Sequence, residues 1–284
     1  MGMFSDILLT VDFDRTLTAT DSTIPPRNLE AIRYFMENGG AFTVNTGRGL
    51  PMAKVFRDRV PVNAPLLLYN GSGAYDVRKN ELQLCHPIPL DPREVVEHLQ
   101  NRFPDMIVEI QGVEAHYIFQ SNKMWENFCD HNGCAWDYKT PEEIPGPFLK
   151  FCLYGPLRDN TVASLYEGTP EEITLFDETQ KYIEETYGHA VDVFRACARI
   201  IDVHAKGVSK LRAARDLQQQ LGRKILICVG DAHNDVPMLA GADYAFCPAD
   251  GVVADQFPNV CPCGEGAVAD VIYEKIPVIL QKRT

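Results

Sequence analysis

The sequence predicts an α/β protein: a doubly wound, Rossmann-like parallel sheet with a second, α+β domain inserted into it. Three observations lead to this fold class. Short apolar runs each end in a polar residue, helical patterns lie between those runs, and a middle stretch follows a different pattern. The length of 284 residues favours two domains or one large one. With 45% hydrophobic and 23% charged residues the composition is globular, which excludes a wholly disordered chain.

Four apolar runs share one design, in which a polar residue follows the last apolar one. They cover residues 7–11, 41–44, 65–69 and 225–229. Because these runs do not alternate between polar and apolar residues, we expect strands buried on both faces, as in a parallel sheet. Ligands bind beyond the carboxyl ends of such strands. The polar residues after the four runs should therefore converge on one edge of the sheet.

Helical patterns separate the predicted strands. Pro25-Pro26 precedes apolar residues at helical spacing, and Gly39-Gly40 ends that pattern. A second helix is expected from about Ser209 to near Gly222. The order strand, helix, strand is the one that a doubly wound domain requires.

The stretch of residues 83–194 is predicted to be an inserted α+β domain, and residues 1–82 with 195–284 form the core domain. Within the insert we expect, in chain order, a hairpin of residues 106–110 and 116–119, a short helix around Trp125 and a strand over 148–154. A helix should follow from a capping box at Thr169 to about Tyr187, and then a strand over 191–194. A further strand over 198–203 should lead back into the core domain.

Charge and composition restrict the partners. The net charge of −12 argues against a nucleic-acid surface or an anionic membrane surface. The apolar runs are far shorter than the ~20 residues of a membrane span. Nine cysteines without regular spacing fit a reducing, cytoplasmic compartment. Cys261 and Cys263 have no second cysteine or histidine pair at a matching spacing, so a structural role is favoured over a metal site.

Carboxylates follow two of the four runs. Asp12 and Asp14 stand just past the first run, where one could attack an electrophile and the other could carry protons. Asp231 and Asp235 follow the fourth run. Clustered carboxylates repel one another, so their convergence implies a counter-cation, and hard oxygen ligands favour Mg²⁺. The alternative is that these residues only cap turns and helix starts.

Two further elements could bind an anion. Thr46, Gly47 and Arg48 follow the second run, where a hydroxyl, backbone N–H groups and a guanidinium form an anion seat. Lys210 lies in the first turn of the second helix, where it opposes the helix dipole unless it points at an anion. An ordinary capped turn and a solvated lysine are the alternatives.

These four elements, in this order, resemble the motifs of the haloacid dehalogenase superfamily of phosphohydrolases. The elements are Asp12-x-Asp14-x-Thr16, then Thr46-Gly47-Arg48, then Lys210, then Gly230-Asp231 with Asn234-Asp235. The position and size of the insert resemble the Cof-type subfamily with a type IIB cap. The resemblance covers nearly the whole chain and makes the insert a cap domain.

The resemblance implies catalytic roles for four residues. Asp12 would be the nucleophile that attacks phosphorus and forms an aspartyl phosphate. Asp14 would be the general acid for the leaving alcohol and then the base for the hydrolytic water. Thr46 and Lys210 would hold the phosphoryl oxygens.

The resemblance also implies a metal site and a set of residues that line the substrate-binding site. Asp231 would share Mg²⁺ with the Asp12 side chain and the Asp14 main-chain carbonyl. Asp235 would support the metal or Lys210. The substrate side would be formed by Gly47, Arg48, Asn70 and Asn234.

The sequence departs from the family pattern at Arg15, where the family commonly has glycine after the second aspartate. Because arginine rarely adopts a positive φ, we expect this turn to use an ordinary backbone region.

The expected function is therefore that of a cytoplasmic Mg²⁺-dependent phosphatase that hydrolyses a small phosphorylated metabolite, such as a sugar phosphate. A sugar phosphomutase of the same superfamily is an alternative, because it differs only in the group that accepts the phosphoryl. A phospho-acceptor signalling module is a remote alternative, because such modules lack a second carboxylate at the position of Asp14 and a cap. The substrate, and whether the protein is a monomer or a homodimer, are left open.

Overall fold

The computed structural model describes residues 2–54, 56–155 and 167–283. The chain forms two compact units, each treated separately below. We call them the core unit (Met1–Gly47, Arg57–Gln83 and Ser209–Thr284) and the cap unit (Arg48–Phe56 and Leu84–Val208).

The core unit is built on a parallel sheet with the strand order β14-β13-β12-β1-β2. Its strands are β1 (Ile7–Val11), β2 (Ala41–Val44), β12 (Ile225–Val229), β13 (Tyr244–Pro248) and β14 (Asn259–Val260). Val11 of β1 lies opposite both Val229 of β12 and Val44 of β2. The carboxyl ends of the three central strands are therefore level, and whatever follows them lies at one edge.

The third predicted run forms β3 (Leu66–Leu68), which belongs to a separate small sheet. That sheet has the order β3-β4-β5, with β4 at Gly73–Asp76 and β5 at Glu81–Cys85. The strand still lies beside β2, because Thr46 donates its backbone N–H to the Leu67 carbonyl at 2.9 Å. The polar residues after β3 thus reach the same edge as those after β2.

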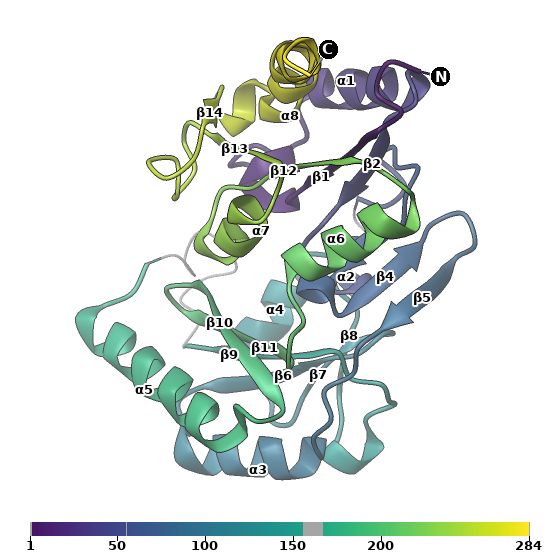
Figure 1. Cartoon of the computed structure of the whole chain (residues 1–284). Coiled ribbons are helices and arrows are strands. Elements are labelled where there is room, and N and C mark those ends of the chain that lie inside the picture. The colour runs from purple at the N-terminus through teal and green to yellow at the C-terminus, as the bar shows by residue number, and fades with distance from the viewer. Residues whose placement is uncertain (1, 55, 156–166, 284) are drawn as a thin grey trace. The chain divides into compact units, whose positions relative to one another are not determined.

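Helices cover both faces of the core sheet, as a doubly wound fold requires. They are α1 (Pro26–Glu37), α6 (Lys210–Gln220), α7 (Val236–Ala240), α8 (Ala267–Asp270) and α9 (Ile276–Gln281). Figure 1 shows α1 and α8 on one face and α6 and α7 on the other. The two helices predicted in this unit are confirmed as α1 and α6. In the described part of the chain no helix is both long enough and apolar enough to cross a bilayer.

The cap unit contains a six-stranded sheet with the order β10-β11-β9-β6-β7-β8. Its strands are β6 (Ile107–Gln111), β7 (His116–Ile118), β8 (Trp136–Tyr138), β9 (Lys150–Tyr154), β10 (Val191–Cys197) and β11 (Ile200–Ala205). Its helices are α2 (Leu50–Ala53), α3 (Pro92–Arg102), α4 (Lys123–His131) and α5 (Pro170–Tyr187). The predicted hairpin is confirmed as β6 and β7, and Thr169 caps α5 in the predicted capping box.

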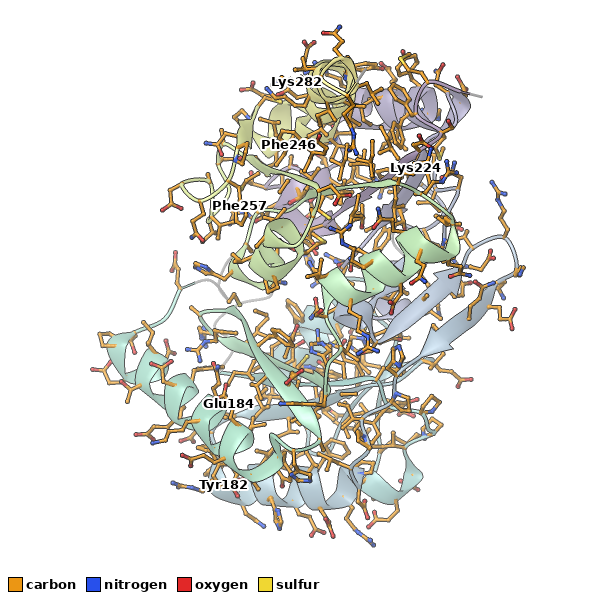
Figure 2. All side chains as sticks on the ribbon, in the orientation of Figure 1. Tyr182, Glu184, Lys224, Phe246, Phe257 and Lys282 are labelled. Atoms are coloured by element: carbon orange, nitrogen blue, oxygen red, sulfur yellow. The ribbon has the colours of Figure 1, made fainter. Side chains whose placement is uncertain are left out.

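The two faces of the cap sheet differ in chemistry. One face packs its apolar side chains against α3 and α5. Figure 2 draws these side chains and labels Tyr182 and Glu184 on α5. The other face packs partly against α4 and carries buried polar side chains, namely Glu109, Gln111, His116, Lys150, Asp202 and His204. Buried polar groups need partners, so this second face contains the most constrained chemistry of the unit.

The division of the chain differs from the predicted one at two places. β11 pairs with β9, so residues 195–208 belong to the cap sheet and the chain returns to the core at Ser209. The physical reason is that β10 and β11 form one hairpin, which cannot be divided between two sheets. Residues 48–56 also belong to the cap unit, although they were expected in the core.

A buried ion pair lies on the polar face of the cap sheet. Lys150 Nζ donates to Asp202 Oδ2 at 2.8 Å, and both side chains are at most 5% exposed. The Cys152 thiol donates to the other carboxylate oxygen at 3.1 Å. Burial alone would raise the pKa of Asp202, but the charges of Lys150 and His204 and the hydrogen bonds from Lys150 and Cys152 together lower it.

Removing one partner of this pair should destabilise the cap strongly, because it leaves a charge buried without its counter-ion. We expect Asp202→Ala to lower the free energy of unfolding by about 3–5 kcal/mol, and a combined Lys150→Met and Asp202→Leu change to recover most of that loss. Urea unfolding followed by tryptophan fluorescence measures the free energy of unfolding of the cap, since both tryptophans, Trp125 and Trp136, lie in the cap unit.

The exposed Lys181–Glu185 pair on α5 is the matched control, with a 3.8 Å separation and side chains 74% and 67% exposed. Lys181→Ala should change the midpoint little, because water screens such pairs. A loss for Asp202→Ala no larger than for Lys181→Ala would contradict the prediction.

Candidate active site

Asp12 is the first residue after β1 and is held at the edge of the core sheet by its backbone. Its N–H donates to the Val229 carbonyl at 2.9 Å, which extends the pairing of β1 with β12 by one residue. Its carbonyl then accepts from the Leu17 N–H at 3.3 Å, which closes a wide turn. The residue is only 7% exposed. The carboxylate is therefore fixed and largely removed from bulk water.

Lys210 is the first residue of α6 and joins two carboxylates. Its Nζ donates to Asp12 Oδ1 at 2.6 Å and to Asp235 Oδ1 at 2.7 Å. The side chain is 3% exposed, so it is not a solvated lysine. Its backbone carbonyl accepts from the Asn45 side-chain amide at 2.9 Å, which ties the start of α6 to the end of β2.

Asp231 and Asp235 lie in the turn that follows β12. Asp231 accepts a hydrogen bond from the Thr16 hydroxyl at 2.9 Å. Asp235 Oδ2 accepts from the backbone N–H groups of Asp231 and Ala232, each at 3.1 Å. One oxygen of Asp235 thus caps the turn, as in the alternative that these residues only cap turns and helix starts, while its other oxygen pairs with Lys210. Asp235 serves both purposes at once.

Oxygens of Asp12, Asp231 and Asp235 lie within 4.8 Å of one another. Burial has the largest effect on the pKa of Asp12 and raises this pKa. The Lys210 ammonium lowers the pKa, whereas the neighbouring carboxylates raise it. The pKa of Asp12 therefore stays well above its usual value. Burial and the charge of Asp235 raise the pKa of Asp231 to about 7. One ammonium is therefore insufficient to balance three buried carboxylates.

This donor set fits a divalent cation. Carboxylate oxygens at close range are the ligands that hard cations such as Mg²⁺ and Ca²⁺ prefer, and the group contains no thiolate or imidazole ligand that would favour zinc. Burial and the neighbouring carboxylates raise the pKa of Asp12 and of Asp231, and a cation bound beside them would oppose that rise. Asp14, half-buried, follows Asp12 by two residues, and a metal contact from its carbonyl stays a prediction.

Thr46 and Asn70 follow the two neighbouring strands of the same edge and lie together. The Asn70 N–H donates to the Thr46 carbonyl at 2.9 Å, and the residues are 1% and 5% exposed. A Cβ on Gly47 would lie 3.0 Å from Asn70 Oδ1, so a side chain at this position would crowd the Asn70 amide. The predicted anion-binding turn is therefore compact and rigid, although its binding role remains a prediction.

The remaining predicted residues lie less centrally. Asn234 is half-buried in the turn His233–Asp235. Arg48 follows Gly47 in sequence but belongs to the cap unit, so its distance from the carboxylates stays a prediction. Cys263 donates its backbone N–H to Asp250 Oδ1 at 2.9 Å and is, like Cys261, a free thiol in the structure.

Two residues of the site were given no role from the sequence. Thr16 positions Asp231, and Asn45 positions Lys210, although each is polar and fully buried. Asn45 Oδ1 is also buried without a hydrogen-bond partner in the described chain. Their positions in the sequence could have indicated these roles. Thr16 follows the nucleophile candidate Asp12 by four residues, and Asn45 is the first polar residue after β2.

The expectation for Arg15 is wrong. Arg15 has φ 58° and ψ 10°, in the left-handed region that favours glycine, instead of the ordinary region expected for arginine. The turn Phe13–Leu17 must bring Thr16 back toward Asp231, and a left-handed residue at its centre reverses the chain in the space available. The charge of Arg15 also acts on Asp231, whose pKa it lowers.

The chain belongs to the family of haloacid dehalogenase-like hydrolases, whose sequence profile matches residues 9–253. It is 25% identical over 238 residues to the HMP-PP phosphatase of Serratia proteamaculans, covering 82% of this chain and 80% of that protein. The family predicted from the motifs is confirmed, and with it the hydrolase class of the enzyme.

Solved structures share the fold. A haloacid dehalogenase-like hydrolase from Bacteroides thetaiotaomicron superposes with a TM-score of 0.77 at 18% identity, covering 95% of this chain and 99% of that one. A sugar phosphatase of haloacid dehalogenase subclass IIB superposes with a TM-score of 0.75 at 18% identity, covering 93% and 97%. The predicted fold class, a parallel-sheet core with an inserted cap, is thereby confirmed.

Replacing Arg15 by glycine should relieve backbone strain. The left-handed conformation costs a non-glycine residue roughly 1–2 kcal/mol, and the extra chain entropy of glycine offsets about half of that. We expect Arg15→Gly to be more stable than Arg15→Ala by about 0.5–1 kcal/mol. Both variants lack the side chain, so their difference isolates the strain.

Urea unfolding followed by far-ultraviolet circular dichroism provides the comparison. A result in which Arg15→Ala is the more stable of the two variants would show that the turn stores no such strain.

Proposed function

We propose that this hydrolase is a Mg²⁺-dependent phosphatase that cleaves small phosphorylated metabolites through an aspartyl phosphate on Asp12. One observation carries the proposal: the buried Asp12 carboxylate touches Lys210 and lies beside Asp231 and Asp235 in a cluster with too little positive charge. The names of the phosphatase relatives support the reaction, and those of the HMP-PP phosphatase and the sugar phosphatase support a small phosphorylated substrate.

Asp12 is assigned the attack on phosphorus. Its Oδ1 accepts the short hydrogen bond from Lys210, whose positive charge favours the ionised carboxylate and opposes the effect of burial. The other oxygen, Oδ2, would form the new bond to phosphorus while the bond to the leaving oxygen breaks on the opposite side. The fixed backbone of Asp12 holds that oxygen in one orientation and lowers the entropy that the reaction would otherwise lose.

Asp12, Asp231 and Asp235 are the side chains that would hold the cation. When bound, Mg²⁺ supplies positive charge that allows an anionic substrate to approach and that stabilises the charge on the transferring phosphoryl oxygens. Thr16 orients Asp231 for this purpose, and Lys210 orients Asp235.

Thr46 and Lys210 are assigned to the phosphoryl oxygens. The backbone N–H of Thr46 is already bonded to the Leu67 carbonyl, so the group that Thr46 can offer a ligand is its hydroxyl. Lys210 adds an ammonium at a fixed position. Asn70, which is bonded to the Thr46 backbone, would border the same oxygens.

Asp14 is assigned the proton transfers. It would protonate the leaving alcohol in the first step and accept a proton from the water that cleaves the aspartyl phosphate in the second. A second carboxylate two residues from the first is what a rapid second step requires, so it also argues against a long-lived phospho-acceptor.

The cytoplasmic location remains part of the proposal, supported by the free thiols of the eight described cysteines.

The Asp12→Asn variant tests this assignment. The protein with Mg²⁺ should release phosphate from p-nitrophenyl phosphate and from some members of a sugar-phosphate panel. Asparagine keeps the shape but is a poor nucleophile, so turnover should fall by at least about 10³-fold. Asp216→Asn makes the same change at an exposed carboxylate of α6 and should retain full activity.

Tracing the phosphoryl group separates hydrolysis from transfer to a second sugar. Label that appears in inorganic phosphate supports the phosphatase, whereas label in a second sugar hydroxyl would favour the phosphomutase. Wild-type turnover in Asp12→Asn would refute the nucleophile assignment in either case.

A further inference from the structure

A buried row of ionisable side chains crosses the cap unit, on the polar face of its sheet. At one end Glu109 is 1% exposed and its carboxylate accepts from four donors, namely His116 Nδ1 at 2.9 Å, Gln111 Nε2 at 2.7 Å, Trp125 Nε1 at 2.6 Å and the Tyr154 hydroxyl at 3.5 Å. So many donors stabilise the ionised carboxylate, and the pKa of Glu109 is lowered even though burial opposes this.

His116 stands in the middle of the row and carries the matching positive charge. Burial is the largest single influence and would lower its pKa, but the charge and hydrogen bond of Glu109 together with the neighbouring Cys134 sulfur raise the pKa of His116 to about 10. Its second ring nitrogen, Nε2, is buried and has no hydrogen-bond partner in the described part of the chain. The ring lies near Cys134, because the His116 backbone N–H donates to the carbonyl of the next residue, Ala135, at 2.9 Å.

Cys134 lies next to a second thiol because of the way α4 ends. Gly133 adopts φ 62°, and the Cys134 N–H donates to the Cys129 carbonyl at 2.9 Å. This is the Schellman arrangement, which brings the side chains at these two positions into contact. Cys129 and Cys134 pack in the same apolar cluster, the Cys134 thiol donates to the Ala135 carbonyl at 3.4 Å, and both thiols are free in the structure.

The two thiols differ in acidity. A hydrogen bond from Cys129 and the charge of His116 lower the pKa of Cys134 to about 6, whereas that of Cys129 is raised. The other described cysteines for which a shift is resolved all have a raised pKa, chiefly because of burial; they are Cys152, Cys197, Cys228, Cys247, Cys261 and Cys263. Thiolates, and not thiols, are the nucleophiles.

We propose that Cys134 is an oxidation site for small hydroperoxides and that Cys129 is its resolving partner. The geometry places the Cys134 sulfur near His116, whose ring is held by a buried carboxylate, and it places Cys129 beside Cys134 in the same buried cluster. At 5% and 2% exposure the pair is open only to small oxidants. The inference concerns the cap alone and does not depend on the proposed phosphatase activity.

The chemistry balances in two steps. The Cys134 thiol first loses its proton to the solvent; the thiolate attacks one peroxide oxygen, the O–O bond breaks, and the leaving hydroxide takes up a proton equivalent to the one released and departs as water, which leaves a sulfenic acid. The Cys129 sulfur then attacks the Cys134 sulfur, the S–O bond breaks, and water leaves with the Cys129 proton. The cysteine pair loses two electrons, the peroxide gains two, and a disulfide is formed.

The full-length protein treated with hydrogen peroxide should lose the mass of two hydrogen atoms. Peptide mapping after alkylation of the remaining thiols should place the link between Cys129 and Cys134, and dithiothreitol should reverse it. Cys134→Ser should abolish the reaction. Cys129→Ser should stop at a sulfenic acid that dimedone traps. Cys197→Ser, the matched change at a half-buried cap cysteine, should leave the reaction unchanged.

The positioning role of His116 has its own readout. The alkylation rate of Cys134 measured against pH should have its midpoint clearly below the ordinary cysteine value of about 8.5, and His116→Gln should move it upward and slow the peroxide reaction at neutral pH by about tenfold or more. Glu109→Gln acts through His116 and should shift the midpoint in the same direction.

The wild-type profile decides the matter even if these variants fold poorly. A Cys134 midpoint at or above about 8.5, or oxidation of Cys134 no faster than that of Cys197, would overturn the proposal.

Discussion

The structure of the core unit depends on one electrostatic constraint, which is that three carboxylates are buried within reach of a single ammonium. Isolated, such a group would be expelled from a protein interior, because burying a charge without a partner costs several kcal/mol. Lys210 compensates part of the charge, and hydrogen bonds from Thr16 and from the backbone before Asp235 compensate more. Burial and the repulsion between the carboxylates are not fully offset, so the pKa of Asp12 and of Asp231 stays raised. The negative charge that is left uncompensated makes the cluster suited to a divalent cation.

The fold keeps these charges in place through close backbone approaches. A Cβ on Gly230 would lie 2.6 Å from Asp235 Cγ, so that position permits the carboxylate to turn back over its own strand. A Cβ on Gly71, whose φ is 101°, would lie 2.6 Å from the Ser209 carbonyl, at the start of α6. The two glycines allow the turn after β12 and the first residue of α6 to meet at the sheet edge.

The sequence predicted the parts of this arrangement that follow from strand ends. Level carboxyl ends of parallel strands bring Asp12, Thr46 and Asp231 to one edge, and the unusual place of Lys210 in its helix indicated an anion. The left-handed Arg15 could not be predicted, because it results from the path that Thr16 needs to reach Asp231. The return of the chain at Ser209 depends on the pairing of β11 with β9, a contact between distant segments. The pairing of Cys129 with Cys134 is local, since Gly133 ends α4 between them, but His116 comes near Cys134 only in the folded cap.

The central claim, that the carboxylate cluster is built for a divalent cation, is tested most directly by calorimetric titration of Mg²⁺ into the protein without substrate. The wild type should bind one Mg²⁺ saturably, Asp231→Asn should lose most of that affinity, and Asp216→Asn should keep it. Absence of saturable binding in the wild type, or unchanged affinity in Asp231→Asn, would contradict the account.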